Sequence, residues 1–70
     1  MKGAKVMTRE MVEQICTDLF TNGVVVDKPH HWYIRSQEVV WKFILKELME
    51  YPELIGIKTS EQSTIVIFKK

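Results

Sequence analysis

The stretch VVVDKPHHWYIR, residues 24–35, contains two β-prone runs on either side of a proline-bearing turn. Three consecutive valines form the first run, and Trp32 to Arg35 form the second. Branched and aromatic side chains fit the pleated surface of a sheet, and Pro29 cannot donate a ladder hydrogen bond, which places it in the connection. The stretch therefore predicts a β-hairpin.

Helical patterns precede this hairpin and follow it. Thr8 is a candidate N-cap for a helix over 8–21, which the left-handed conformation favoured by Asn22-Gly23 would end. Ser36 is a candidate N-cap for a second helix that continues to about residue 51, because Pro52 cannot extend it. Residues 54–58 and 64–69 then predict a second hairpin with a polar tip.

The predicted order is α-β-β-α-β-β, an α+β fold with two helices packed on one face of a small antiparallel sheet. Seventy residues hold one small core, so we expect a single domain over 8–70 after a flexible N-terminal tail over 1–7. The second helix and the terminal hairpin, with Lys58 at its base and residues 60–63 at its tip, loosely resemble the end of a winged-helix domain. That resemblance covers the last half of the chain. It departs from the family in having no basic residue at the tip, and it implies no residue roles.

Composition and cysteine usage bear on the compartment. The chain is 46% hydrophobic and 27% charged, close to the average of folded domains. Cys16 is the only cysteine, so no intramolecular disulfide forms. With no apolar run long enough for a signal peptide or a membrane span, we expect a cytoplasmic protein.

No pattern in the chain is typical of an active site. Cys16 lies on the apolar arc of the first predicted helix, where burial suppresses thiolate chemistry. His30 and His31 are adjacent and point in opposite directions in an extended segment, which disfavours a shared metal. A domain of this size also leaves little room for a pocket of about 300 Å³. We expect no enzymatic activity, no cofactor and no metal.

The net charge of +1 conceals a separation of charge. Residues 8–21 and 36–53 each carry −2, and the rest of the chain carries +5. Nucleic-acid affinity depends on where cations cluster, and aromatic rings among them add stacking. We therefore predict a nucleic-acid-binding protein, for DNA or RNA, with a regulatory role such as transcription control, of the kind filled by small accessory proteins of phages and bacteria. The predicted contact residues are Lys28, His31, Tyr33, Arg35, Lys58, Lys69 and Lys70. The alternative is that residues 32–35 only follow strand alternation, with Trp32 and Ile34 in the core.

Surplus apolar surface predicts a protein partner as well. The second helix is apolar around most of its circumference, and the last strand carries apolar residues on both faces, so both elements require further cover. A homodimer is the leading expectation, and a tightly wrapped monomer is the alternative. The second functional hypothesis is a protein-interaction module, an inhibitor or adaptor, that also uses the acidic helix faces. The predicted interface residues are Trp41, Leu45, Met49, Val66 and Phe68.

Overall fold

The computed structural model describes residues 7–37 and 42–70. The predicted α-β-β-α-β-β order is confirmed. The elements are α1 (Arg9–Leu19), β1 (Gly23–Asp27), β2 (His31–Ser36), α2 (Lys42–Leu48), β3 (Leu54–Thr59) and β4 (Thr64–Lys69). Both hairpins are present, and the protein is a small α+β domain. Among the described residues, no helix has the length and apolar content needed to cross a bilayer.

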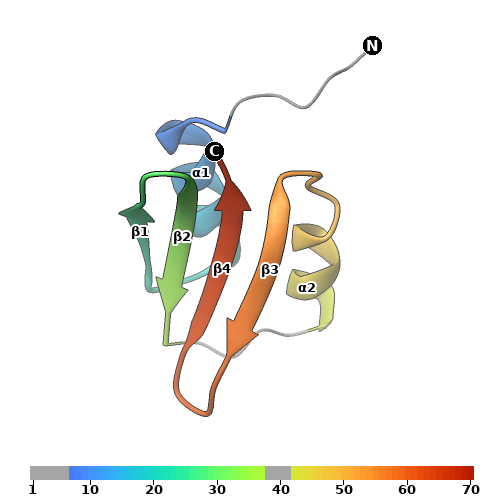
Figure 1. Cartoon of the computed structure of the whole chain (residues 1–70). Helices are drawn as coiled ribbons and strands as arrows, with labels where there is room; N and C mark the ends of the chain where they lie inside the picture. Colours follow the sequence, from blue (N-terminus) through green and yellow to red (C-terminus); the bar gives the residue numbers. More distant parts are fainter. Residues whose placement is uncertain (1–6, 38–41) are drawn as a thin grey trace.

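The two hairpins join through their second strands. The strand order is β1-β2-β4-β3 with every pair antiparallel, so β2 and β4 occupy the centre of the sheet (Figure 1). The helix-then-hairpin order that resembles the end of a winged-helix domain is present as α2, β3 and β4, but this hairpin is one half of a continuous four-stranded sheet. Both edges of β2 and both edges of β4 are therefore paired within the sheet.

One face of the sheet forms the core with both helices. Trp32 and Ile34 of β2 lie beside Phe68 and Val66 of β4, and all four side chains are buried. The helices contribute the opposite side of this core through Val12, Ile15 and Cys16 of α1 and through Ile44 and Leu48 of α2. Each large apolar side chain buried in this way contributes about 1.5–3 kcal/mol relative to exposure.

The N-terminal boundary of the domain lies earlier than predicted. Thr8 caps α1 as expected, because its Oγ1 accepts a hydrogen bond from the Met11 backbone N–H at 3.2 Å. Met7, which we assigned to the flexible tail, is buried in the core, and its carbonyl oxygen accepts a hydrogen bond of 3.0 Å from Trp32 Nε1–H. The ordered domain therefore includes Met7, and residues 1–6 lie outside the described residues.

The first helix does not end with the left-handed cap that was predicted at Asn22-Gly23. The helix ends at Leu19, and Phe20 follows in an extended conformation while its N–H donates to the Cys16 carbonyl oxygen at 2.9 Å. No residue in 7–37 or 42–70 has a positive φ, so Asn22 and Gly23 supply no left-handed cap. Gly23 instead begins β1.

The second helix is shorter than predicted. Ser36 is not its N-cap, because Ser36 is the last residue of β2 and is buried between Gly23 and Thr64 in the ladder. Of the predicted range 36–51, α2 occupies Lys42–Leu48, and residues 38–41 lie outside the described residues. After α2 the chain forms i→i+3 hydrogen bonds, including Tyr51 N–H to the Leu48 carbonyl oxygen at 3.1 Å, before Pro52.

Candidate nucleic-acid interface

The side of the sheet opposite the helices carries two rows of side chains and one further pair. Strand register places Val24, Arg35, Ile65 and Lys58 in one row across all four strands. The neighbouring row is Val26, Tyr33, Ile67 and Gly56, and His31 lies opposite Lys69 beyond it. Because alternate strand residues share a face, these ten residues form one surface, which we call the open face.

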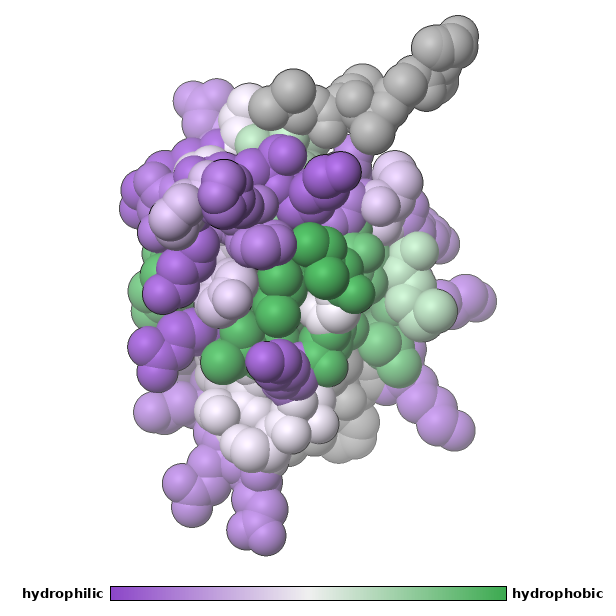
Figure 2. Space-filling view, viewed as in Figure 1, coloured by the Kyte–Doolittle hydropathy of each residue, from purple (hydrophilic) through white to green (hydrophobic). Residues whose placement is uncertain are grey.

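The open face has an apolar centre and a polar margin. Tyr33, Ile65 and Ile67 are half-buried, and Val24 at the edge strand is 61% exposed. Figure 2 shows hydrophobic residues gathered at the middle of this face and continuing toward the right of the view, with hydrophilic residues mainly above and to the left. Such a surface offers apolar contact at its centre and charge at its margin.

Six of the seven predicted contact residues belong to this surface or lie directly against it. His31, Tyr33, Arg35, Lys58 and Lys69 are members of the open face. Lys28 follows β1, and its Nζ lies 5.6 Å from the centroid of the Tyr33 ring, a cation–π distance. The His31 and Tyr33 ring centroids are 6.4 Å apart. The turn and both hairpins thus bring these residues together, while Trp32 and Ile34 face the core as strand alternation predicted.

Lys70 is placed differently from the prediction. Its Nζ forms an ion pair with the Asp27 carboxylate and lies 4.3 Å from the centroid of the Trp32 ring, whose side chain faces the core. Its backbone N–H donates to the His30 carbonyl oxygen at 3.2 Å. Lys70 therefore ties the end of β4 to the first hairpin and is not a member of the open face.

Charge is separated by face as well as by segment. Glu10, Glu13 and Asp18 are exposed on α1, and Glu47 and Glu50 are exposed on or just after α2. None of the ten residues of the open face is acidic. On α2 and just after it, the exposed Lys42 and Lys46 balance Glu47 and Glu50, so the acidic part of the helical side is α1, and the margin of the sheet side is basic.

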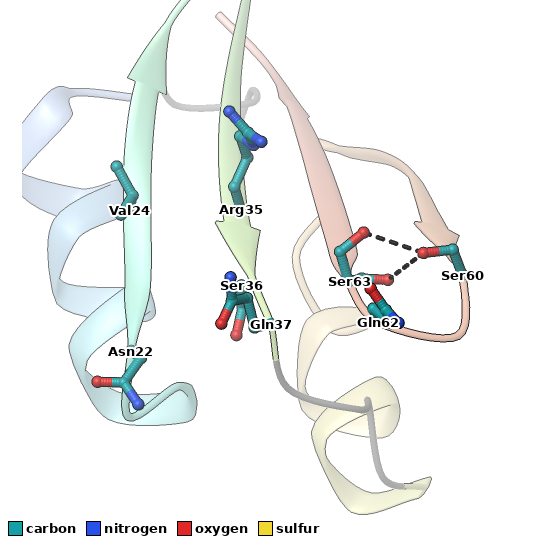
Figure 3. A pocket seen from close by; sticks show the side chains of 8 residues that line it. All are labelled: Asn22, Val24, Arg35, Ser36, Gln37, Ser60, Gln62 and Ser63. Carbon is teal, nitrogen blue, oxygen red and sulfur yellow. Dashed lines mark hydrogen bonds between the residues drawn. The ribbon is translucent and has the colours of Figure 1, made fainter.

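A pocket of about 450 Å³ lies at the end of the open face (Figure 3). Its residues come from the start of β1, the end of β2 and the tip of the β3–β4 hairpin: Asn22, Val24, Arg35, Ser36, Gln37, Ser60, Gln62 and Ser63. We expected a domain of this size to leave little room for a pocket of about 300 Å³. The observed pocket is larger than that volume, so this expectation is wrong. Sequence reasoning missed the pocket because its three contributing segments are distant in the chain.

The predicted protein interface is partly wrong. Val66 and Phe68 are fully buried against the helices, so they form the core and no surface. Met49 is 67% exposed and Leu45 is 39% exposed, and Trp41 lies outside the described residues. Phe43, which we did not select, is 69% exposed on α2. The signal that would have identified it is the apolar circumference of the helix, which leaves side chains on the side away from the core.

The cysteine and the two histidines do not form a common site. Cys16 is buried, as expected. His30 is exposed in the turn, and His31 is half-buried at the margin of the open face. In the described part of the chain, no group of three or more His, Cys, Asp or Glu residues is arranged to hold a metal ion.

Comparisons of the chain with protein-family models, curated proteins and solved structures find no match.

Proposed function

We propose that this protein binds nucleic acid through the open face and acts by binding, without catalysis, in a regulatory or accessory role. The observation that carries the proposal is the position of five basic or aromatic residues, predicted from the sequence, on one acid-free side of the sheet. A cytoplasmic location, expected from the cysteine content, belongs to the same proposal.

The chemistry of the surface fits a single strand better than a duplex. Lys58, Lys69 and Arg35 lie around the apolar centre, where they neutralise phosphates. Tyr33 and the isoleucines beside it offer an aromatic and apolar surface. Unstacked bases can pack against such a surface, whereas the exterior of a duplex presents phosphates. The net negative charge of α1 repels the same polyanion and so favours its approach to the sheet.

The binding affinity is expected to fall steeply as salt rises. Four cations, namely Lys28, Arg35, Lys58 and Lys69, each displace counterions from the strand, so log K against log salt has a slope of about −3 for single-stranded nucleic acid. This slope corresponds to roughly a 50-fold loss of affinity between about 50 and 200 mM salt. Fluorescence anisotropy with labelled DNA and RNA strands measures it. No binding of either strand at tens of micromolar protein and low salt would refute the proposed function.

The exposed apolar side chains of α2, with Met49 directly after it, favour a protein contact in addition. Phe43 and Met49 are each about two-thirds exposed, and Leu45 adds further apolar surface. We propose that α2 pairs with a second copy of the chain, because isologous pairing is the commonest way to cover such a surface. An inhibitor or adaptor function through α2 and the acidic helix faces is the competing proposal.

Phe43→Lys combined with Met49→Lys is expected to convert a dimer into a monomer. Both side chains are exposed, so the substitutions disturb the contact while leaving the core intact. Sedimentation equilibrium at micromolar concentrations measures the mass, and Lys46→Gln on the same helix is the control. A wild-type chain that sediments at monomer mass across this range would contradict the dimer and favour a different protein as the partner of α2.

A further inference from the structure

The pocket at the end of the open face is continuous with it. Arg35 and Val24, which are paired in the ladder, both belong to the open face and both line the pocket. Ser36 and Gln37 follow Arg35, and the tip of the β3–β4 hairpin forms the opposite wall (Figure 3). A nucleic-acid strand that lies along the row of Val24, Arg35, Ile65 and Lys58 therefore also contacts the pocket.

The pocket differs from the rest of the surface in its hydrogen-bonding groups. Its walls carry the Gln37 and Gln62 amides and the Arg35 guanidinium. An amide has both donors and an acceptor, which is the pattern on the edges of nucleobases, whereas a guanidinium has only donors and suits phosphate or guanine. None of the eight lining residues is acidic, so none of their side chains repels a phosphate that enters.

These groups remain available for a ligand within the described structure. In residues 7–37 and 42–70, no carboxylate forms an ion pair with Arg35, and the Gln37 and Gln62 side chains make no hydrogen bond. The hairpin tip that carries Gln62 is already fixed by its own contacts. Ser60 N–H donates to the Ser63 carbonyl oxygen at 2.8 Å, and the two hydroxyls share a hydrogen bond of 3.0 Å.

The remainder of the open face has few groups that distinguish one base from another. Valine and isoleucine contact any base, stacking on Tyr33 is tolerant of sequence, and lysines at the margin bind phosphates that carry no sequence information. Selectivity among bases therefore requires groups outside the apolar centre. The pocket supplies them, and its volume of about 450 Å³ falls in the range of sites for small ligands.

We propose that this pocket holds one nucleotide of a single strand lying on the open face and that it sets the base preference of the protein. The inference rests on the proposed nucleic-acid function. Arg35 pairs with the phosphate at the pocket entrance, and the Gln37 and Gln62 amides bond the edge of the base. Val24 provides the apolar wall against which the base lies.

The test compares base preference between the wild type and a pocket variant. Labelled strands of about eight nucleotides, made of A, C or T in DNA and of A, C or U in RNA, are titrated by anisotropy, with guanine placed singly in the thymine strand. The wild type is expected to bind its best strand at least about tenfold more tightly than its worst strand of the same sugar. Gln37→Leu with Gln62→Leu is expected to reduce that ratio to about twofold, since leucine retains bulk and loses the amide.

Two matched variants separate the pocket from the face. Gln14→Leu makes the same substitution at an exposed position of α1 and should leave the ratio unchanged. Lys69→Gln should weaken every strand by the same factor, because Lys69 lies on the open face away from the pocket. Equal wild-type affinity for all bases, or a ratio that persists in the double variant, would overturn the inference while leaving the proposed function standing. No binding of any strand would overturn both.

Discussion

Replacing Gly23 with alanine is expected to lower the free energy of unfolding by about 3 kcal/mol. A Cβ atom at this position would overlap Cys16 Sγ and lie 3.2 Å from Phe20 Cβ. Gly23 pairs with Ser36 in the ladder, so β1 cannot move away from α1 without losing its pairing. A domain of this size has on the order of 4–10 kcal/mol of stability, so the loss is a large share of the total. Urea unfolding followed by circular dichroism measures it.

Gly56 provides the matched control for this substitution. A Cβ atom at Gly56 meets nothing within 4 Å, because this glycine lies on the open face. Gly56→Ala is therefore expected to be neutral or to stabilise the protein by up to about 1 kcal/mol, since alanine restricts the unfolded chain. Destabilisation of similar size at both glycines would show that the effect of Gly23→Ala does not arise from contact with α1.

The contact between Gly23 and Cys16 also predicts coupling between the two positions. Cys16→Ala removes the sulfur that the new Cβ would overlap. The double variant Cys16→Ala with Gly23→Ala should therefore lose less free energy of unfolding than the two single variants lose in total. The expected difference is about 1–2 kcal/mol, the size found for side chains in direct contact. Strictly additive losses would argue that the overlap is relieved by some other movement.

Local patterns predicted the elements well. Thr8 caps its helix because capping depends on hydrogen bonds within a few residues, and both hairpins formed where β-prone runs flank polar turns. Alternation along residues 32–35 also predicted which of these side chains of β2 share a face. These features depend on neighbours in the chain, which the sequence displays directly.

Features that depend on strand order were not predictable from the same patterns. Ser36 has the composition of an N-cap, but its pairing with both Gly23 and Thr64 places it in a strand. Val66 and Phe68 were indistinguishable from surface residues until the sheet assigned their face to the helices. Gly23 is required by the approach of α1, and no local pattern reports a contact between separate elements.

The candidate site follows the same division. Alternation identified Tyr33 and Arg35 as one face of a strand, whereas their proximity to Lys58 and Lys69 depends on β4 pairing with both β2 and β3. The pairing of Lys70 with Asp27 was not predictable from local patterns, because the two residues lie 43 positions apart in the chain. A count of charges by segment thus predicted a separation of charge but not the ion pair between Lys70 and Asp27.

Reversing two charges of the open face should produce the largest loss of function. Arg35→Glu combined with Lys69→Glu is expected to weaken binding to a single strand by at least roughly 100-fold at about 50 mM salt, because two phosphate contacts become repulsive. Both side chains are exposed, and no ion pair in the described structure involves them, so the fold should be retained. Anisotropy measures the affinity, and circular dichroism verifies the fold.

The decisive control carries the same net charge on the other side of the molecule. Lys42→Glu combined with Lys46→Glu changes two exposed lysines of α2 and gives an identical total charge. If the strand binds the open face, this variant should retain affinity within about threefold, because screening limits the influence of charges more than about 10 Å from the strand. Equal losses in both double variants would indicate a general response to net charge and would contradict the assignment of the open face. A larger loss in the Arg35 and Lys69 variant than in the Lys42 and Lys46 variant would show that the charges of the open face determine binding, and the reverse order would contradict it.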